Sequence, residues 1–359
     1  MSQALKVLFI TRAYSAGAGG MERLSYELIT SIKELPDIQA TVVANETPTN
    51  ASLLAARLRS ILFVLFVAPR AIWAARTADV IHLGDPLLSK IGWLIQKLWR
   101  KPVVVTVHGL DVTFSNPIYR LYLKLFFRHF NAYVAISEYA KRMTETWNVT
   151  GTIHVIPPGA HDRMYDPNIS RNQLDQLLNR LTADTTVLLT TGRLVARKGH
   201  AWFVQHVLPS LPANTLYVIA GSGPEQAAIM QTARTANMTD RVQMLGRVSD
   251  EALQVLTNTV DVFIQPNISV PGDAEGFGIV LIEAALCNRR VIASNIDGIP
   301  AAIHDGKNGH LVEPENTEEW TRAITSASDT TLSPREYTLD HFSWNTIRRE
   351  YAALFEELK

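Results

Sequence analysis

Short apolar runs that alternate with amphipathic helical patterns constrain this fold more than any other feature. A run that is nearly continuous in apolar residues is typical of a parallel strand buried on both faces. Because parallel neighbours require a crossover connection, the alternation predicts doubly wound α/β sheets. Six runs fall in each half of the chain: residues 6–11, 40–44, 79–83, 102–107, 132–136 and 153–156, then residues 186–190, 216–220, 241–245, 260–265, 290–293 and 310–312.

Two domains of similar architecture follow from this pattern. A length of 359 residues is also typical of two domains. In open parallel sheets, ligands collect at the carboxyl ends of the strands. His108 follows one such strand and Ser137 another, so we expect both to face a ligand site. A lone histidine in such a place is nevertheless more often structural than catalytic.

The loop between the run 260–265 and the next helical pattern is the strongest candidate for a ligand site. Gly276 and Gly278 flank Phe277 directly before this helix, which begins near Ile279. Glycines at a helix N-terminus let several N–H groups point at one spot, where the helix dipole also favours negative charge. The pattern therefore predicts a phosphate seat.

Two carboxylates bracket this loop: Glu275 precedes the glycines and Glu283 lies within the helix. The glycines separate them, so they cannot share one helix face. They can instead hold opposite ends of an extended ligand whose phosphates lie between them. On spacing alone, a pair of ordinary solvated glutamates is an equal alternative.

Basic residues follow the run 186–190, where Arg193 comes after Gly192 and Arg197 precedes Lys198. Cations on a strand-end loop can neutralise a diphosphate without a metal. We expect Arg193 and Lys198 to lie on a loop that faces the ligand, so that neither is needed for folding. Ordinary surface cations are the alternative.

Composition narrows the function further. Lys+Arg and Asp+Glu balance at 34 each, so no nucleic-acid partner is indicated. The single cysteine excludes an intrachain disulfide. No Asp-x-Asp pair or HExxH spacing suggests a metal, and no cofactor is expected. The N-terminus lacks the pattern of a signal peptide, and no run is long enough to span a membrane, so we expect a cytoplasmic protein.

These motifs together resemble the retaining glycosyltransferases of family 4. The resemblance rests on Glu-Gly-Phe-Gly with a second glutamate eight positions after the first, on Gly-Arg-Leu and Lys-Gly, and on Gly-Gly-x-Glu-Arg near the N-terminus, and it covers nearly the whole chain. It implies the GT-B fold, in which two Rossmann-like domains face each other across a cleft. The implied domains are residues 1–165 for the acceptor and 166–342 for the nucleotide sugar, with a final helix, 343–359, that crosses back to the first.

The resemblance also implies roles for individual residues. Transfer of a hexosyl group from a UDP- or GDP-linked sugar would proceed with retention of configuration and without a metal. Arg193 and Lys198 would hold the diphosphate, Glu275 would bind the transferred sugar, and His108 would lie near its reacting carbon. We see no nucleophile on the protein, so the leaving phosphate would take the proton of the acceptor. The remaining donor-binding residues would be Gly19, Gly20, Gly192, Arg247, Val248, Gly276, Phe277, Gly278, Ile279 and Glu283.

Three positions depart from the family pattern. His161, followed by Asp162, stands where the family has an aspartate, and Asp297 and Ala301 stand where it has glycine and glutamate. We therefore assign none of these residues a role.

Other functions remain open. A nucleotide-sugar 2-epimerase can share the GT-B architecture and would use the donor alone. A non-catalytic nucleotide-sugar binder is a further alternative, although the intact acidic and basic motifs argue against it. An NAD-dependent oxidoreductase is weakest, because no G-x-G-x-x-G follows either first strand.

The acceptor is expected to be lipid-linked or part of a cell-envelope glycan, reached by a domain that contacts an anionic membrane peripherally. Residues 1–165 carry 18 Lys+Arg against 11 Asp+Glu. Two segments, residues 57–76 and 119–130, combine cations with large apolar side chains. In the second, Arg120, Lys124 and Arg128 have the spacing of one helical stripe. Two ordinary core helices are an equal alternative.

Overall fold

The structure is a computed structural model, and it describes residues 4–12, 14, 20–44, 67–326 and 333–359. The chain divides into two compact units. The first comprises residues 1–159 together with Trp344–Lys359, and the second comprises Ala160–Ser343. The first boundary between the units thus falls after Gly159.

The first unit contains a parallel six-stranded sheet in the order β2-β1-β3-β4-β5-β6. The strand order reverses between β1 and β3, which makes the sheet doubly wound. Its strands are β1 (Leu5–Thr11), β2 (Ile38–Ala44), β3 (Val80–Leu83), β4 (Val103–Val107), β5 (Ala132–Ala135) and β6 (Thr152–Val155). Its helices are α1 (Gly20–Lys33), α3 (Ser89–Trp99), α4 (Leu110–Thr113), α5 (Pro117–Phe126), α6 (Glu138–Glu145) and α14 (Trp344–Glu357), and residues 67–74 are also helical.

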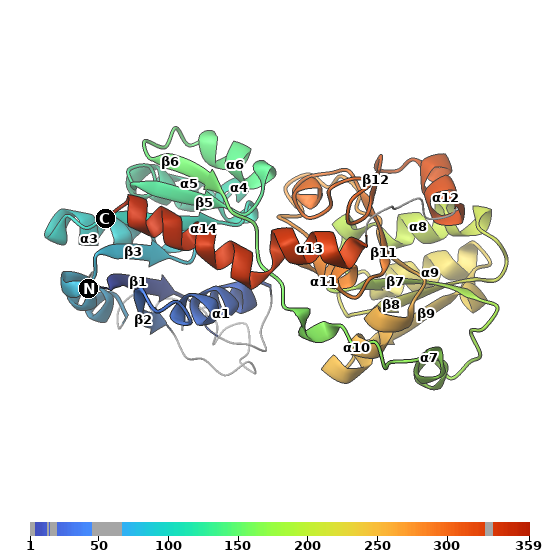
Figure 1. Cartoon of the computed structure of the whole chain (residues 1–359). Coiled ribbons are helices and arrows are strands. Elements are labelled where there is room, and N and C mark those ends of the chain that lie inside the picture. The colour runs from blue at the N-terminus through green and yellow to red at the C-terminus, as the bar shows by residue number, and fades with distance from the viewer. Residues whose placement is uncertain (1–3, 13, 15–19, 45–66, 327–332) are drawn as a thin grey trace. The chain divides into compact units, whose positions relative to one another are not determined.

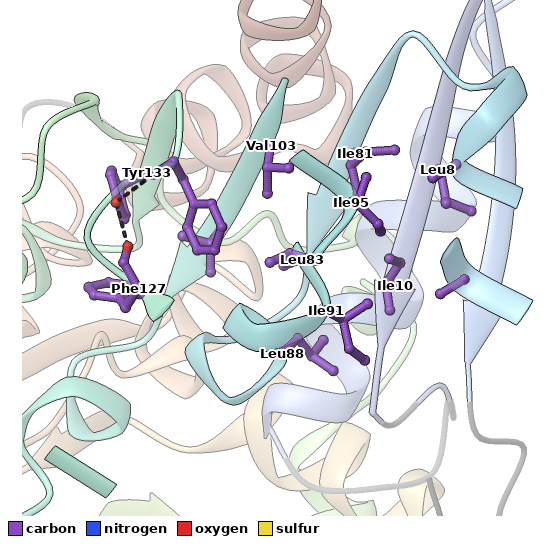
Figure 2. Close-up of a cluster of buried hydrophobic side chains, with 14 of the residues drawn as sticks. Leu8, Ile10, Ile81, Leu83, Leu88, Ile91, Ile95, Val103, Phe127 and Tyr133 are labelled. Atoms are coloured by element: carbon purple, nitrogen blue, oxygen red, sulfur yellow. Dashed lines mark hydrogen bonds between the residues drawn. The ribbon is translucent and has the colours of Figure 1, made fainter. Parts of the chain in front are cut away.

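Helices cover both faces of this first sheet, because successive strand residues point to opposite sides. On one face Leu8 and Ile10 of β1 pack with Ile91 and Ile95 of α3 (Figure 2). On the other face α1 and α14 supply the apolar residues, and Figure 1 shows α14, in red, running along this unit. The helix 344–357 therefore completes the core of a unit whose strands lie more than 180 residues earlier.

The helix α5 is shorter than the sequence predicted. It ends at Phe126, so Arg128 does not continue the stripe of Arg120 and Lys124. The Tyr133 hydroxyl donates a hydrogen bond to the Phe127 carbonyl at 2.6 Å (Figure 2). In a longer helix, a backbone N–H of the next turn would donate to this carbonyl instead. The ring of Phe127 turns into the core, where it is fully buried.

The second unit contains another parallel six-stranded sheet, in the order β12-β11-β10-β7-β8-β9. Counted within the unit, this is the Rossmann order 3-2-1-4-5-6 read from the other edge. Its strands are β7 (Thr186–Thr191), β8 (Thr215–Ala220), β9 (Val242–Gly246), β10 (Val262–Gln265), β11 (Arg290–Ser294) and β12 (His310–Val312). Its helices are α7 (Arg171–Leu178), α8 (His200–His206), α9 (Gln226–Thr235), α10 (Asp250–Thr259), α11 (Ile279–Leu286), α12 (Thr317–Thr325) and α13 (Pro334–Phe342).

This second sheet is also buried on both sides. Leu188, Tyr217 and Ile264 pack with α8, α9 and α12. The alternate residues Leu189 and Phe263 are fully buried as well. All twelve predicted strands are present, in two doubly wound parallel sheets, and the predicted fold class is confirmed. Within the described ranges, no helix combines the length and the apolar character needed to cross a membrane.

Candidate active site

The candidate site lies at the carboxyl edge of the second sheet, where the strand order reverses between β7 and β10. Loops that leave two such strands in opposite directions open a crevice in which ligands of α/β proteins bind. The basic loop follows β7, and the glycine-rich loop follows β10. The topology thus brings together the two motifs that the sequence singled out.

Close backbone contact joins these two loops. The basic loop folds into a short 3-10 helix, η4 (Ala196–Lys198), and then passes through Gly199, whose φ is +66°. A Cβ at Gly199 would lie 1.8 Å from the carbonyl oxygen of Pro266, in the other loop. Only glycine fits here. Lys198, directly before this contact, is only 6% exposed.

The Lys198 ammonium forms an ion pair with Glu275, with 2.6 Å between Nζ and Oε2. Arg197 forms a second ion pair to the same oxygen at 2.7 Å, and a third to Asp273 at 3.1 Å. Glu275 is therefore held by two cations that come from the neighbouring loop. The amide groups of Gln265 and Asn267 also approach Oε2, at 3.4 and 3.5 Å.

Burial and charge act in opposite directions on this pair. Burial alone would raise the pKa of the Glu275 carboxyl, but Lys198 and Arg197 outweigh it and keep that pKa below its ordinary value. Burial lowers the pKa of the Lys198 ammonium, and Glu275 opposes this effect. Lys198 and Arg197 are balanced in formal charge by Glu275 and Asp273, so both cations already have a carboxylate partner within the site.

Two hydrogen bonds connect the backbone of Glu275 to the loop that follows β11. The carboxylate of Asp297 accepts a hydrogen bond from the Glu275 N–H at 3.0 Å, and the Gly298 N–H donates to the Glu275 carbonyl at 2.9 Å. Asp297 has a φ of +55°, the left-handed conformation that a glycine would also adopt. This side chain thus departs from the family pattern but keeps its turn and adds a hydrogen bond.

The helix α11 begins at Ile279, directly after Gly278, whose φ is +88°. Phe277 is buried against Phe342, with 6.1 Å between the ring centroids, so it anchors the glycine loop. Glu283 lies half-buried within α11. The predicted helix N-terminus after a glycine loop is therefore present and lies next to Glu275 in the chain.

The other predicted donor-binding residues of this unit follow β7 and β9. Gly192 and Arg193 are exposed after β7, and Arg247 and Val248 follow β9. The guanidinium of Arg247 donates to the Ser222 hydroxyl at 3.1 Å. These residues share the carboxyl edge of the sheet with Glu275.

The glycine turn after β8 lies against the loop that follows β7. A Cβ at Gly221 would lie 1.7 Å from the Gly192 carbonyl oxygen, and one at Gly223 would lie 2.1 Å from that of Leu194. Both glycines are therefore required by the close approach of two turns.

In the first unit, His108 follows β4 at the carboxyl edge. Its N–H donates to the carboxylate of Asp111 at 2.9 Å, and its Nε2 lies 3.0 Å from the carbonyl oxygen of Gly84. Burial raises the pKa of Asp111, and the nearby His108 opposes this effect. Gly20 begins α1, whereas Gly19 lies outside the described residues.

Sequence reasoning named Lys198 and Glu275 but missed their direct contact, and it gave no role to Arg197, Asp273 or Asp297. The nearness of Arg197 to Lys198 and of Asp273 to Glu275 was the only signal available. In the part of the chain that the structure covers, no group of three or more His, Cys, Asp or Glu side chains could hold a metal.

Two family models match the chain. One, described as Glycosyltransferase Family 4, matches residues 18–162, and the other, described as Glycosyl transferases group 1, matches residues 185–329. A GDP-mannose-dependent alpha-(1-6)-phosphatidylinositol monomannoside mannosyltransferase of Mycolicibacterium smegmatis is 25% identical over 282 residues, 74% of this chain and 73% of that protein. A D-inositol 3-phosphate glycosyltransferase of Corynebacterium jeikeium is 26% identical over 308 residues, 78% and 72% of the two chains.

Solved structures share the fold. Anabaena Alr3699/HepE in complex with UDP-glucose has a TM-score of 0.74 at 20% identity, covering 98% of this chain and 100% of its own. Sucrose-phosphate synthase from Thermosynechococcus elongatus has a TM-score of 0.78 at 20% identity, covering 99% of both chains. These likenesses agree with a two-domain GT-B fold. Taken with the two family models, they lead to the conclusion that this chain belongs to the group 1 glycosyltransferases of family 4.

Proposed function

We propose that the protein is a retaining glycosyltransferase that moves a hexosyl group from a UDP- or GDP-linked sugar to an acceptor hydroxyl. The observation that carries this proposal is the cluster of Lys198, Arg197 and Glu275 at the strand-order reversal of the second sheet. Such a cluster offers positive charge for a diphosphate and a carboxylate for sugar hydroxyls. The names of two relatives support the same reaction class. One is a GDP-mannose-dependent mannosyltransferase and the other is a D-inositol 3-phosphate glycosyltransferase.

Each residue in this proposal has a separate task. Arg193 and Lys198 stabilise the charge that develops on the leaving diphosphate, and the amides of the Gly276–Gly278 loop assist them. Glu275 binds the transferred sugar and Glu283 binds the ribose. The backbone at Arg247 and Val248 contacts the base. His108 of the first unit acts near the reacting carbon, and the leaving phosphate accepts the acceptor proton.

No metal or other cofactor is proposed, because cations of the protein serve the diphosphate. Lys198 is buried, so its charge acts in surroundings of low polarity, where it is worth more than in water. Arg193 is exposed at the same edge of the sheet. The ion pair with Glu275 fixes the position of the Lys198 side chain but not that of Arg193.

A screen of nucleotide sugars tests this function. UDP-glucose and GDP-mannose would be tried first by thermal shift, then by donor hydrolysis and by transfer to candidate acceptors. We expect one nucleotide sugar to raise the melting temperature and to be hydrolysed slowly without an acceptor. Conversion of the donor to its 2-epimer would instead support the epimerase alternative, and binding without any product would support a non-catalytic binder.

We further propose that the acceptor is lipid-linked and that the first unit meets it at an anionic membrane. The support comes from a surface that we call the basic-apolar face, formed by residues 67–77, α3 and α5. Trp93 of α3 contacts Phe126 of α5, and the Trp99 indole donates to the Ile72 carbonyl, so the three segments are continuous. Its exposed apolar side chains are Trp73, Leu98, Trp99, Ile118, Leu121 and Leu125.

Charge on this face has one sign. Residues 67–130 contain nine Lys+Arg against three Asp and no Glu, a net charge of +6. None of the three aspartates is exposed. Asp79 accepts from the Lys6 N–H, Asp85 pairs with Arg12, and Asp111 accepts from His108. The exposed cations of the face are Arg70, Arg76, Lys90, Lys97, Arg120 and Lys124.

Exposed apolar side chains among unopposed cations fit the boundary of an anionic bilayer, where each basic residue contributes about 1 kcal/mol. Ile118 is 78% exposed and Leu121 57%, whereas Leu123 and Phe127 are fully buried, so only part of the apolar surface of this segment lies in the core. The names of the two relatives include both a lipid and a soluble inositol phosphate acceptor, so a soluble acceptor is the competing proposal.

Cosedimentation with vesicles separates the two acceptor classes. We expect binding to vesicles that contain anionic lipid, weaker binding at high salt, and little binding to neutral vesicles. Binding that ignores lipid charge, or no binding, would favour the soluble acceptor.

A further inference from the structure

The two oxygens of the Glu275 carboxylate have different surroundings. Lys198, Arg197, Gln265 and Asn267 all direct a donor at Oε2. No hydrogen bond reaches Oε1 from any residue that the structure describes. One oxygen is thus fixed by the protein, and the other is left to accept a hydrogen bond from a ligand.

Arg197 is the residue best placed to fix Oε2. Its guanidinium spans two carboxylates, with Nη1 on Glu275 at 2.7 Å and Nε on Asp273 at 3.1 Å. Its carbonyl also accepts from the Ile268 N–H at 3.0 Å, so its backbone is tied to the loop that carries both carboxylates. The side chain is only 15% exposed. A planar fork held in this way sets direction as well as charge.

We propose that Arg197 is a positioning residue for the donor sugar: it holds Oε2 of Glu275 so that Oε1 is presented to a sugar hydroxyl. This inference rests on the proposed glycosyl transfer. In it, Lys198 is shared between Glu275 and the diphosphate, whereas Arg197 stays on Glu275 and Asp273 throughout.

The different roles of Lys198 and Arg197 follow from how each responds to the charge of the ligand. A nucleoside diphosphate brings negative charge to Lys198, which weakens the hold of that ammonium on Glu275. Arg197 cannot lose its proton, so it keeps Glu275 ionised when Lys198 turns to the phosphates. The charged groups that face Glu275 are Lys198, Arg197, Asp273 and Asp297, and the nearby amides of Gln265 and Asn267 are neutral.

The test compares Arg197→Ala and Arg197→Lys with wild type. As a matched control, Asp261→Asn removes an ion pair of the same kind, to Arg171, in the same unit but outside the site. The measurements are kcat/KM for UDP-glucose or GDP-mannose across pH, and calorimetry with the bare nucleotides UDP and GDP. The nucleotide sugar is the one that wild type turns over.

We expect Arg197→Ala to lower kcat/KM at pH 7 by about 10- to 100-fold, because a misplaced sugar group has costs of that order. Its affinity for the bare nucleotide should stay within about twofold of wild type, since the sugar is absent. The acid limb of the profile should move to higher pH, because Glu275 loses a cation that lowers its pKa. Arg197→Lys should restore most of the acid limb but only part of the rate. Asp261→Asn should behave like wild type in kcat/KM, in its pH profile and in nucleotide affinity.

Two outcomes would overturn the assignment, and they differ. Equal losses for bare nucleotide and nucleotide sugar, with an unmoved acid limb in both Arg197 variants, would mean that Arg197 is merely structural. A wild-type protein that neither binds nor turns over any nucleotide sugar would remove the proposed function and this assignment with it.

Discussion

Lys198 and Arg193 share one proposed task but lie in different surroundings. Lys198 is buried and paired with Glu275, whereas Arg193 is exposed. We expect alanine at either position to reduce turnover by about 100-fold or more, the usual cost of one preorganised contact to developing charge. Only Lys198→Ala should also lower the melting temperature, by the equivalent of about 1–3 kcal/mol, because it leaves Glu275 short of a buried partner. Steady-state kinetics and calorimetric unfolding measure the two effects.

Near-normal turnover in one of these variants would remove that residue from the site. A lower melting temperature for Arg193→Ala would mean that its charge has a structural partner.

The two glutamates should separate binding from transfer. Glu275→Gln keeps the size of the side chain but loses the charge that holds Lys198 and Arg197, so transfer should suffer more than affinity for the bare nucleoside diphosphate. Glu283→Ala should weaken nucleotide affinity itself, because Glu283 is proposed to bind the ribose. Calorimetry with UDP and GDP decides this, and equal loss of affinity in both variants would contradict the assignment.

Asp297 offers a prediction about pH. Burial raises the pKa of its carboxyl above the unfolded value, despite the hydrogen bond from Glu275. A raised pKa in an acid favours the protonated folded form, so its contribution to stability is greatest below the unfolded pKa and falls as the pH rises through the folded pKa. Asp297→Asn keeps an acceptor and tolerates the positive φ. The melting temperature of Asp297→Asn minus that of wild type should therefore increase between pH 4 and pH 7.

A difference that stays constant over this range would mean that Asp297 titrates as it does in the unfolded chain. Asp297→Ala, which loses the acceptor and suffers the strain of a positive φ, should be less stable than wild type at every pH.

At the scale of single elements, α5 carries the clearest prediction. It presents Ile118, Leu121 and Leu125 outward on one stripe, beside Arg120 and Lys124. Ile118→Ser combined with Leu121→Ser should reduce binding to anionic vesicles several-fold, because the apolar part of the attachment is lost while the charge remains.

A matched control exists in the second unit. Leu181 is 84% exposed but lies outside the basic-apolar face. Leu181→Ser should leave vesicle binding unchanged. Equal binding by the α5 double variant and wild type would exclude α5 from the contact.

Elements were easier to predict than their contacts. The buried strands could be recognised because a parallel strand covered on both faces needs apolar residues at every position. The end of α5 could not be recognised in this way, because the hydroxyl that donates to the Phe127 carbonyl belongs to Tyr133 of β5. Likewise, Arg197 and Glu275 are 78 positions apart, and only the folded sheet brings their loops together. The local pattern thus predicted the sheets and named Lys198 and Glu275 of the candidate site, but it predicted neither the part of Arg197 nor which cation contacts which oxygen.

At the scale of the whole molecule, we predict that turnover persists in excess chelator. The charge on the diphosphate is assigned to Arg193, Lys198 and the N-terminus of α11, and not to a metal ion. Kinetics with and without EDTA, on protein purified in chelator, measure this. Loss of activity that magnesium or manganese restores would show that the leaving group needs a metal.

The first unit depends on a distant part of the chain. Its core includes Trp344, Ile347, Tyr351 and Phe355 of α14, which is separated from the rest of the unit by all of the second unit. A ribosome therefore completes residues 160–343 before it supplies the last piece of the first core. Until then the face of the first sheet beside α1 stays uncovered, so the nascent chain must keep an apolar surface from aggregating while its second unit folds. Translation that stops before Trp344 would yield a chain with all of the second unit but an incomplete core in the first. Quality-control proteases can recognise the apolar surface left exposed there.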